Sequence, residues 1–529
     1  MQKKSVVVVG AGIGGLVAAR QLARDGFAVT VLEAGDTAGG CVATHTVAGI
    51  HLDSGAESFA TRGGTVAAFL AELGLGQSVV SPDARGAWLQ LPNAAAPLPK
   101  NTLLGIPGVP LATDVRVILG WRGAIRAQLD RVLPFVRVRK EADLGDLVRR
   151  RMGRAVLDRL VAPVVSGVHS AHPDLVDVHA VAPGLTTAMT NQGSLSGAVM
   201  SIIARRGQAP DGRTPAGDEA SGATTSGENT NGLARNGDGD APGGRPAPGS
   251  AVGGVDGGMY RLVEALVADC ERLGVNLQFG VGVESVRRVA SETPGSAEWM
   301  TVLADETVLG SHGVVVAAGF RAALALLRTV ADSGPAPTVD EKLSGAASLE
   351  SDLARQTRAE SWPGSSVVTL ATLVLDAPEL DAAPRGTGVL VAEDVTAVPA
   401  KALTHATVKW PWLARDAGPG RHVVRLSYGR GGQTPPAITL EQALRDAALL
   451  LDTELTQGQV RGFALTDWRD SLAFATTGHR ARVDALVEAV HGHPGLEVCG
   501  AWVSGTGLAY VIDGAGVKAR ALAQQLASA

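Results

Sequence analysis

The residues whose types and spacing could do chemistry lie near the start of the chain. They are a run of glycines and small residues, followed by one acid: Gly10, Ala11, Gly12, Ile13, Gly14, Gly15 and Glu33. Glycines let a backbone turn sharply and approach a pyrophosphate, and the free N–H groups of a helix that follows attract phosphate charge. An acid some twenty residues later can accept hydrogen bonds from a ribose hydroxyl.

The elements around these residues follow a recognisable order. An apolar strand over 5–9 leads into the glycines, residues 16–24 repeat apolar side chains at helical spacing, and 28–32 form a second strand that ends at Glu33. Strand, glycine turn, helix, strand and acid are the parts of a dinucleotide-binding βαβ unit. The charge of Glu33 disfavours the extra phosphate of NADP, but the unit alone does not distinguish NAD from FAD.

Length, composition and charge set wider limits. The 529 residues are enough for two or three domains, and 45% hydrophobic with 19% charged residues is typical of a soluble globular protein. A net charge of −5 gives no electrostatic case for nucleic-acid binding. Three widely spaced cysteines without metal-ligand spacing favour a reducing cytoplasm, and no apolar run is long enough to span a bilayer. We therefore expect a cytoplasmic protein without a metal site, with peripheral membrane contact left open.

The residues that follow the unit resemble flavoproteins. Glu33 and three later residues resemble the extension of the unit in flavin amine oxidases, carotenoid desaturases and protoporphyrinogen oxidases: Ala34, Gly39 and Gly40. Segment 53–59 is similar to the Gly-x-Glu-Ser segment of the porphyrinogen-oxidising branch, through Gly55, Ala56, Glu57 and Ser58. The resemblance implies FAD held without a covalent bond. Cys41, which follows Gly40, leaves covalent attachment open.

Three later positions extend this resemblance. Val283 matches a position whose backbone contacts the adenine, and Trp468 stands where relatives carry a tryptophan. Segment 498–512 is similar to the turn that meets the isoalloxazine ring and leads into the C-terminal helix, through Gly500, Gly507, Leu508 and Ala509. The dipole of such a helix can favour negative charge on a reduced flavin. The alternative for Val283 is an ordinary sheet residue of an α/β domain.

Segments 98–107 and 160–173 resemble the FAD-dependent protoporphyrinogen/coproporphyrinogen oxidase family. The resemblance implies a six-electron oxidation of a porphyrinogen in haem biosynthesis, with hydrides passed to the flavin and O2 reduced to H2O2. The soluble composition is similar to the Gram-positive branch, which implies coproporphyrinogen III as substrate. Protoporphyrinogen IX oxidase, an FAD amine oxidase and a non-enzymatic porphyrin carrier stay open as alternatives.

Four residues are candidates for substrate binding: Lys100, Arg159, Gly167 and Lys409. A buried propionate needs cationic or polar partners, although a solvated surface role is open for each cation. No Ser-His-Asp set, acid pair or metal cluster stands out, so we name no catalytic residue, which suits a protein whose cofactor carries the chemistry. His169 and His172 lack a third ligand at metal spacing, and we interpret them as loop histidines.

The fold class that follows is α/β, in the sense of an α+β multi-domain protein. We expect a Rossmann-like FAD-binding domain (1–90, 252–325 and 466–529), an antiparallel-sheet substrate domain (91–102 and 326–465) and a helical domain (103–206). Residues 207–251 are too poor in aliphatic side chains to fold, which predicts a disordered low-complexity insertion. The arginine-rich stretch 111–160 is either a solvated helix face or a basic surface for an acidic substrate or anionic lipid. Contact with a haem-pathway enzyme and the oligomeric state stay open.

Overall fold

The structure, a computed structural model, describes most of the chain, and the account below concerns that part. The described residues are 3–61, 63–133, 143–169, 171–208, 252–289, 297–333, 351–362, 367–430, 434–469 and 476–528. The predicted insertion 207–251 lies almost wholly outside them, so its disorder stays a prediction. No helix among the described residues has the length and apolar character needed to cross a membrane.

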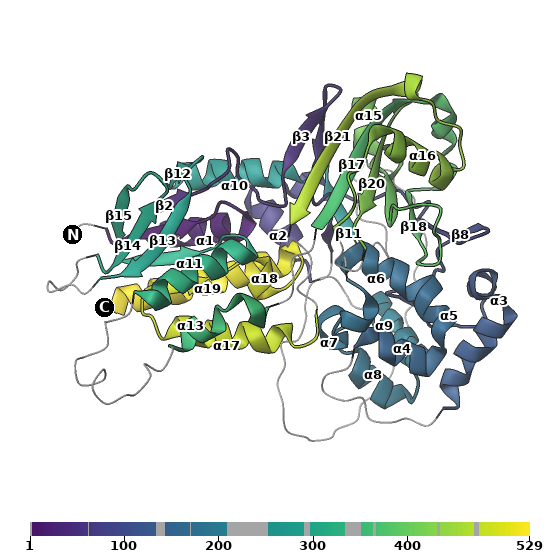
Figure 1. Ribbon diagram of the computed structural model, residues 1–529, viewed down its shortest axis with the longest axis horizontal. Coiled ribbons are helices and arrows are strands. Elements are labelled where there is room, and N and C mark those ends of the chain that lie inside the picture. The colour runs from purple at the N-terminus through teal and green to yellow at the C-terminus, as the bar shows by residue number, and fades with distance from the viewer. Residues whose placement is uncertain are drawn as a thin grey trace, which may run out of the picture.

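Five parallel strands form the sheet that carries the glycine turn (Figure 1). Their order is β12-β2-β1-β16-β22, and the bounds are β1 (Ser5–Val9), β2 (Ala28–Leu32), β12 (Asn276–Gln278), β16 (Gly313–Val316) and β22 (Leu496–Val498). The central strand β1 pairs in parallel with both β2 and β16. Because all five strands run the same way, their carboxyl ends share one edge, and the turn over 10–15 leaves β1 at that edge.

Both faces of this sheet are covered, as the solid apolar run of β1 requires. Val6 and Val8 belong to a core shared with α1 (Ile13–Arg24), α10 (Tyr260–Arg272) and α19 (Leu508–Ser528). Val7 and Val9 point the other way, into a core shared with α11 (Phe320–Asp332) and α17 (His479–His491). A three-stranded antiparallel sheet also contributes to this second core: β13 (Val283–Arg288), β14 (Trp299–Leu303) and β15 (Val308–Ser311).

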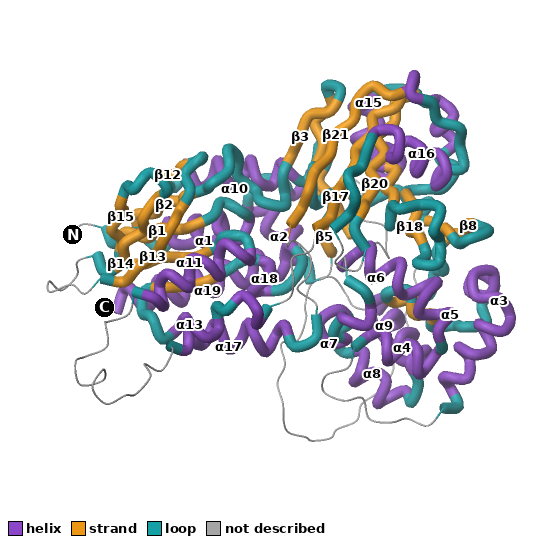
Figure 2. Tube along the Cα trace, in the orientation of Figure 1, coloured by secondary structure: helices purple, strands orange, loops and turns teal. Residues whose placement is uncertain are grey.

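A second large sheet lies beside the first (Figure 2). Its strand order is β21-β17-β20-β19-β18-β7-β8, with bounds β21 (Val460–Arg469), β17 (Val367–Asp376), β20 (Arg421–Tyr428), β19 (Ala402–His405), β18 (Gly388–Val391), β7 (Trp88–Gln90) and β8 (Ala95–Pro97). Every pairing is antiparallel except β18 with β7. α16 (Leu440–Leu451) packs on one face of this sheet, and α14 (Ala406–Lys409) and α15 (Pro411–Ala417) connect β19 to β20.

A group of helices packs below this second sheet in Figure 1. It comprises α3 (Thr113–Gln128), α4 (Leu144–Met152), α5 (Arg154–Val156), α6 (Ala162–His169), α7 (Val178–Val181), α8 (Leu185–Gln192) and α9 (Leu195–Gln208). One continuous core joins these helices to the sheet, because residues such as Leu160 and Leu403 share it. The smaller elements include α2 (Thr65–Glu72), α13 (Asp352–Gln356), α18 (Ala501–Ser504) and the hairpin β3 (Thr44–Val47) with β4 (Ile50–Asp53).

Most of the predicted elements are confirmed. The helix expected from Thr65 is α2, the strands expected over 366–375 and 422–427 are β17 and β20, and the described part of 111–160 is mainly helical. The fold class, a mixture of a parallel Rossmann-like sheet, an antiparallel sheet and a helical part, is confirmed as well. The strand expected from Val281 begins two residues later, at Val283.

Candidate functional site

The glycine turn is tight because its backbone atoms touch. A Cβ on Gly15 would lie 1.9 Å from Gly10 O, and one on Gly10 would lie 2.8 Å from Ala317 O. Gly10 also has a φ of +106°, which L side chains rarely adopt. A Cβ on Gly12, by contrast, would meet nothing within 4 Å. Gly12 therefore faces open space at the start of α1, while Gly10 and Gly15 serve the packing of the turn.

The first turn of α1 is left without a cap of its own. Gly12 is its N-cap, no side chain bonds to the free N–H groups there, and the first turn contains no acidic residue. The positive end of the helix dipole and its N–H donors are thus available to an anion in the open space beside Gly12.

Glu33 closes one side of the turn. Its Oε2 accepts a hydrogen bond from Ala11 N at 2.7 Å, and its Oε1 accepts one from Gly35 N at 2.9 Å. Gly39 N donates to Ala11 O at 2.8 Å, so the segment after Glu33 folds back over the glycines. A Cβ on Gly40 would lie 3.3 Å from Gly12 Cα. The predicted residues 10–15, 33 and 39–40 therefore form one contiguous cradle.

The C-terminal turn completes this cradle from the far end of the chain. A Cβ on Gly14 would lie 3.2 Å from Gly500 Cα, and Gly500, Gly505 and Gly507 all have positive φ. Leu508 begins α19, and it packs with Ala509 on the core beneath α1. Thr506 Oγ1 is buried and has no hydrogen-bond partner among the described residues. A buried hydroxyl without a partner at this turn points to a ligand that satisfies it.

Segment 53–57 joins the cradle to the second sheet. A Cβ on Gly55 would lie 2.1 Å from Cys41 O and 3.0 Å from Trp468 Cζ2. Ala56 N donates to Cys41 O at 2.9 Å, and Trp468 Nε1 on β21 donates to Ser54 O at 2.9 Å. Glycine is required at 55 because the backbone of Cys41 and the indole of Trp468 leave no room for a side chain.

Charged groups fix the same junction. Lys409 Nζ, at the end of α14, lies 2.6 Å from Glu57 Oε1, and Arg425 Nη1 on β20 lies 3.6 Å from Glu57 Oε2. Arg425 also donates to Asp53 O at 2.8 Å and to Gly55 O at 2.9 Å. The side chains of Glu57, Lys409 and Arg425 are 13%, 18% and 13% exposed. One carboxylate and two cations thus hold the segment that begins at Asp53 against the sheet.

The pKa values of the two acids at this junction shift in opposite directions. Burial by itself raises the pKa of Glu57, but the charges of Lys409 and Arg425 outweigh it and lower that pKa to about 2. Burial raises the pKa of Asp53 to about 6, although its carboxylate accepts hydrogen bonds from Met259 N and Tyr260 N, both at 3.0 Å. Glu57 is consequently ionised at neutral pH, whereas Asp53 titrates near pH 6.

The remaining cofactor candidates lie near the cradle and make fewer contacts with it. Val283 begins β13, two residues after Val281, whose N–H donates to Glu33 O at 2.8 Å. Ile13 is buried at the start of α1, and Ala34 is exposed next to Glu33. Ser58 is half-buried beside Glu57. All three cysteines are free, and Cys41 is exposed while Cys270 and Cys499 are buried.

The four substrate candidates do not form one cluster. Lys409 pairs with Glu57, as described above. Lys100 is exposed in the loop before β9 (Thr102–Leu103), and Arg159 Nε lies 3.8 Å from Asp394 Oδ2. A Cβ on Gly167 of α6 would lie 3.0 Å from a methyl of Leu390 on β18. Gly167 therefore allows a close approach of helix and sheet.

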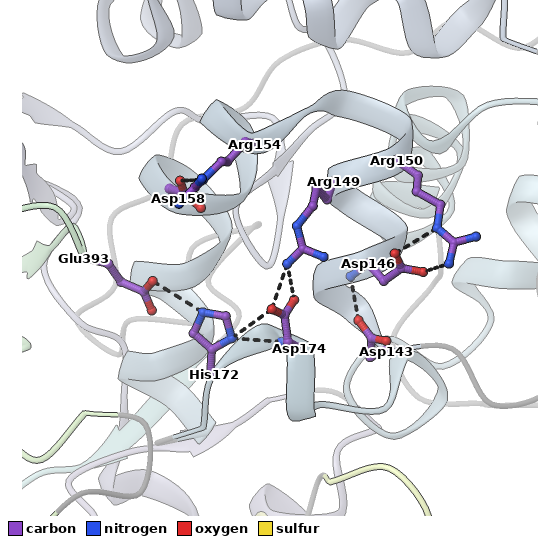
Figure 3. Close-up of polar contacts among 9 residues, drawn as sticks. All are labelled: Asp143, Asp146, Arg149, Arg150, Arg154, Asp158, His172, Asp174 and Glu393. Atoms are coloured by element: carbon purple, nitrogen blue, oxygen red, sulfur yellow. Dashed lines mark hydrogen bonds and ion pairs between the residues drawn. The ribbon is translucent and has the colours of Figure 1, made fainter.

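His172 and Arg149 of the helical group both lie against carboxylates (Figure 3). His172 lies between two carboxylates, with its Nε2 3.4 Å from Glu393 Oε2 and its Nδ1 3.6 Å from Asp174 Oδ2. Asp174 in turn pairs with Arg149 at 2.6 Å. The described residues contain no group of three or more potential metal ligands. His172 lies in a loop as expected, but His169 is the last residue of α6, so its interpretation as a loop histidine was wrong. The side chain of His169 lies outside the described residues.

One arginine of this run does not follow the expectation of a solvated face. Arg151 is 8% exposed, and its Nε lies 2.7 Å from Oδ1 of the fully buried Asp130. Asp130 also accepts hydrogen bonds from the backbone of Leu195 and Ser196. Arg151 is therefore a core ion pair of the helical group, whereas Arg149 and Arg150 pair at the surface.

Two contributors to the site carried no sequence signal that we used. Arg425 stands within the alternating strand β20, where a charged residue among apolar ones indicates a buried partner. Thr506 lies between Gly505 and Gly507, and the sequence pattern predicted a role for Gly507 but not for Thr506.

A parallel sheet, a glycine turn at its carboxyl edge, an uncapped helix and an acid after the second strand define a dinucleotide-binding fold. Comparison with known proteins narrows the class. The chain belongs to the family described as flavin containing amine oxidoreductase, which it matches over residues 13–527. A flavin is the cofactor that this family description implies.

Several relatives match along most of their length. A protein named coproporphyrinogen III oxidase from Mycobacterium tuberculosis (strain H37Rv) is 28% identical over 98% of this chain and 96% of its own. One of the same name from Propionibacterium freudenreichii is 29% identical, with 95% and 88% covered. The one from Bacillus subtilis is 22% identical, with 97% and 96% covered.

Solved structures show the same fold. The crystal structure of an Exiguobacterium sp. 255-15 protein, described as a proposed protoporphyrinogen oxidase, superposes with a TM-score of 0.73. It is 20% identical, with 99% of both chains covered. Cyclohexylamine oxidase from Brevibacterium oxydans gives a TM-score of 0.60 at 14% identity, over 99% of this chain and 100% of its own. At these identities the likeness concerns the fold alone.

Proposed function

We propose that this chain is an FAD-dependent oxidase that converts coproporphyrinogen III to coproporphyrin III. The observation that carries the proposal is the match, over nearly the full length, to relatives named for that reaction. The reaction removes six electrons and six protons from the macrocycle. We take O2 as the acceptor, so that three molecules of O2 become three of H2O2.

The cradle supports FAD as the cofactor. The open space beside Gly12 and the uncapped N-terminus of α1 suit a pyrophosphate, and Glu33 Oε1 and Oε2 suit a ribose. The orphaned hydroxyl of Thr506 and the start of α19 suit the flavin end. When bound, FAD supplies two-electron acceptance from the substrate and reoxidation by O2.

We propose that FAD is held without a covalent bond. Cys41 is the thiol nearest to the cradle in sequence, and its carbonyl oxygen accepts the hydrogen bond from Ala56 N there. Acid precipitation should leave the yellow chromophore in the supernatant. Colour retained in the pellet would contradict this proposal, and a Cys41→Ala variant that released it would identify the attachment site.

The chain's own residues are assigned to positioning and charge. We propose that residues 1–90, 252–325 and 466–529 form the FAD-binding domain, 91–102 and 326–465 the substrate domain, and 103–206 the helical domain. The Glu57–Lys409 pair lies where the first two meet. A porphyrinogen bound against that junction would have Lys409 and Arg425 near its propionates, with Lys100 and Arg159 further away as candidates. No side chain is needed as an acid or base for this assignment.

Anaerobic mixing of the flavin-loaded protein with coproporphyrinogen III tests the proposal. An oxidase bleaches its flavin absorbance and forms a fluorescent porphyrin, and admission of air restores the colour with formation of H2O2. A protein that binds the substrate without bleaching would be a carrier, and the proposal would fail. A protein that bleaches with an amine and not with a porphyrinogen would be an amine oxidase.

Protoporphyrinogen IX is the second candidate substrate. The mitochondrial protoporphyrinogen oxidase of Nicotiana tabacum is 28% identical over 40% of this chain and 41% of its own. Coproporphyrinogen III carries four propionates and protoporphyrinogen IX two, so the former gains more from cations at the junction. Matched fluorescence assays decide between them, and a higher kcat/KM for protoporphyrinogen IX would replace our choice.

A further inference from the structure

A cavity of about 490 Å³ opens between α11 and the segment 357–360, which follows α13. It lies on the side of the five-stranded sheet that α11 covers, opposite α1, and away from the second sheet in Figure 1. Pockets for small molecules have volumes of this order. Its lining includes Arg321, Leu324, Ala325, Arg328, Arg358 and Glu360. None of its lining residues belongs to the cradle or to the junction, so the cavity is a separate site.

One face of α11 supplies a row of side chains to this cavity. From Arg321 to Arg328 the lining residues are spaced by three, one and three positions, which places them on one side of the helix. Leu324 and Ala325 stand between the two arginines. Seven residues of α-helix rise about 10 Å, so the two guanidinium groups arise at opposite ends of an apolar floor.

The arginines are held in place by contacts of their own. Arg328 Nε donates to Asp332 Oδ1 at 3.1 Å, and its Nη1 donates to Ala354 O at 2.8 Å. The guanidinium carbon of Arg321 lies 5.1 Å from the centroid of the Phe320 ring. Side chains that are already ordered lose less conformational entropy when a ligand binds.

The charge around the cavity is positive. Three arginines stand against one acid, Glu360, among its described lining residues, and Asp332 beside Arg328 adds a second acid. A surface with an excess of one sign attracts ligands of the other sign. A compact polyphosphate prefers donors that converge on one point, as at a helix N-terminus. Here the cations are spread around apolar side chains, which favours anionic groups held apart on an apolar body.

We propose that this cavity binds a small organic molecule with two carboxylates held apart on an aromatic or otherwise apolar body. Arg321 and Arg328 each meet one carboxylate, because a guanidinium and a carboxylate form paired charge-assisted hydrogen bonds. Leu324 and Ala325 lie against the apolar body between them. The binding site does not depend on the reaction proposed above.

A chain of aromatic rings connects the cavity to the C-terminal turn. Trp362 closely follows segment 357–360, and its ring centroid is 5.3 Å from that of Phe320 and 6.0 Å from that of Trp502. A Cβ on Gly500 would lie 3.7 Å from Trp502 Cδ1. A ligand that draws segment 357–360 toward α11 therefore changes the packing next to Gly500, at the cradle. This link to the flavin, unlike the site itself, rests on the FAD that we propose for the cradle.

Isothermal titration of the flavin-loaded protein tests the site. The probes are the para,para′-dicarboxylate of biphenyl, the matching monocarboxylate and ATP. The dicarboxylate should bind about tenfold tighter than the monocarboxylate, or more, because its second carboxylate adds a charge-assisted contact. ATP, whose charges lie together, should bind more weakly than the dicarboxylate.

Matched variants identify the residues. Arg321→Gln and Arg328→Gln should each lower the affinity for the dicarboxylate roughly tenfold. Glu360→Gln should raise it, because a charge of the same sign as the ligand leaves the cavity. Arg445→Gln on α16 is the control, since Arg445 also pairs with an acid four residues away on an exposed helix face and should change nothing. Arg328→Gln also removes a contact to Ala354 O, so Arg321→Gln decides if the former lowers the melting temperature.

The flavin provides a second readout. Saturation with the dicarboxylate should change the flavin absorbance spectrum with the midpoint that the titration gives, and Arg321→Gln should move both midpoints together. A spectrum that stays constant at saturation would overturn the link to the cradle. Calorimetry judges the site by itself, so its result is independent of whether the protein oxidises a porphyrinogen.

A competition titration distinguishes two sources of the ligand. Coproporphyrin III, the product of the proposed reaction, belongs to the same chemical class because it carries propionates on an aromatic ring system. Displacement of the dicarboxylate by coproporphyrin III would assign the site to that product. Binding of the dicarboxylate without such displacement would assign it to another dicarboxylate.

Three results would overturn the proposal. The first is a dicarboxylate that binds no tighter than the monocarboxylate. The second is binding that Arg321→Gln and Glu360→Gln both leave unchanged. The third is ATP that binds tighter than the dicarboxylate, which would assign the cavity to a compact polyanion.

Discussion

Removal of the Lys409 ammonium should destabilise the junction by several kcal/mol. In Lys409→Met the Glu57 carboxylate loses a cation 2.6 Å from Oε1 and keeps Arg425 Nη1 at 3.6 Å from Oε2. The two side chains are 18% and 13% exposed, so water cannot replace the lost partner well. Breaking a buried pair on one side costs about 3–5 kcal/mol. The pKa of Glu57, lowered from 4.5 to about 2, corresponds to about 3 kcal/mol and agrees with that range.

Urea unfolding, followed by tryptophan and flavin fluorescence, measures the loss. Glu57→Gln combined with Lys409→Met should recover much of it, because neither partner is then left charged and alone. Lys409→Arg should also retain most of the stability. The exposed pair Arg480–Asp484, whose side chains are 75% and 56% exposed, supplies the control, and Arg480→Met should cost about 0–1 kcal/mol.

The dependence of the unfolding free energy on pH in the acid range gives a second measurement of the same pair. Because folding lowers the pKa of Glu57, its contribution is complete above about pH 4.5 and is lost as the pH falls toward 2. Lys409→Met should flatten this limb. The reasoning would be refuted if Lys409→Met lost no more unfolding free energy than Arg480→Met and kept the dependence on acid pH that the parent protein shows.

Three further outcomes are expected. Gly15→Ala should prevent folding of the turn, because its Cβ would lie 1.9 Å from Gly10 O. Gly12→Ala should keep the melting temperature of the FAD-free protein and weaken FAD binding in a fluorescence titration, because its Cβ would meet only open space. Glu33→Ala should weaken FAD binding by about 1.5–3 kcal/mol in the same titration, and Glu33→Gln by less. Burial raises the pKa of Asp53 to about 6. The free energy of unfolding should therefore fall by up to about 3 kcal/mol as the pH rises from about 4 to 6. Unfolding of Asp53→Asn at both pH values should show no such fall.

The parallel sheet and its glycine turn could be predicted because their signals are local. The valines of β1 form a continuous apolar run, which is what a strand covered on both faces requires, and Gly10 and Gly15 stand where the turn leaves no space for a Cβ. The antiparallel strand β17 carried a nearly continuous run of apolar and β-branched residues, and β20 carried apolar residues mixed with polar ones. Periodicity and turn chemistry act within a single element, and a sequence displays them directly.

The pairing at the junction could not be predicted for the opposite reason. Glu57 and Lys409 are 352 residues apart, and nothing in either segment states which opposite charge each will meet. The resemblance assigned Glu57 to the cofactor and Lys409 to the substrate, yet the structure pairs them with each other. Arg151 shows the same limit, because a run of three arginines gives no sign that one of them reaches the buried Asp130.

The junction also couples the cofactor cradle to the second sheet. Arg425 on β20 binds the carbonyls of Asp53 and Gly55, while the next residue, Ala56, donates to Cys41 O. Cys41 directly follows Gly40, whose backbone lies against Gly12. Few hydrogen bonds therefore separate β20 from the backbone of the glycine turn. A displacement of β20 must move the wall of the cradle as well, so a residue such as Arg425 can influence cofactor binding without touching the cofactor.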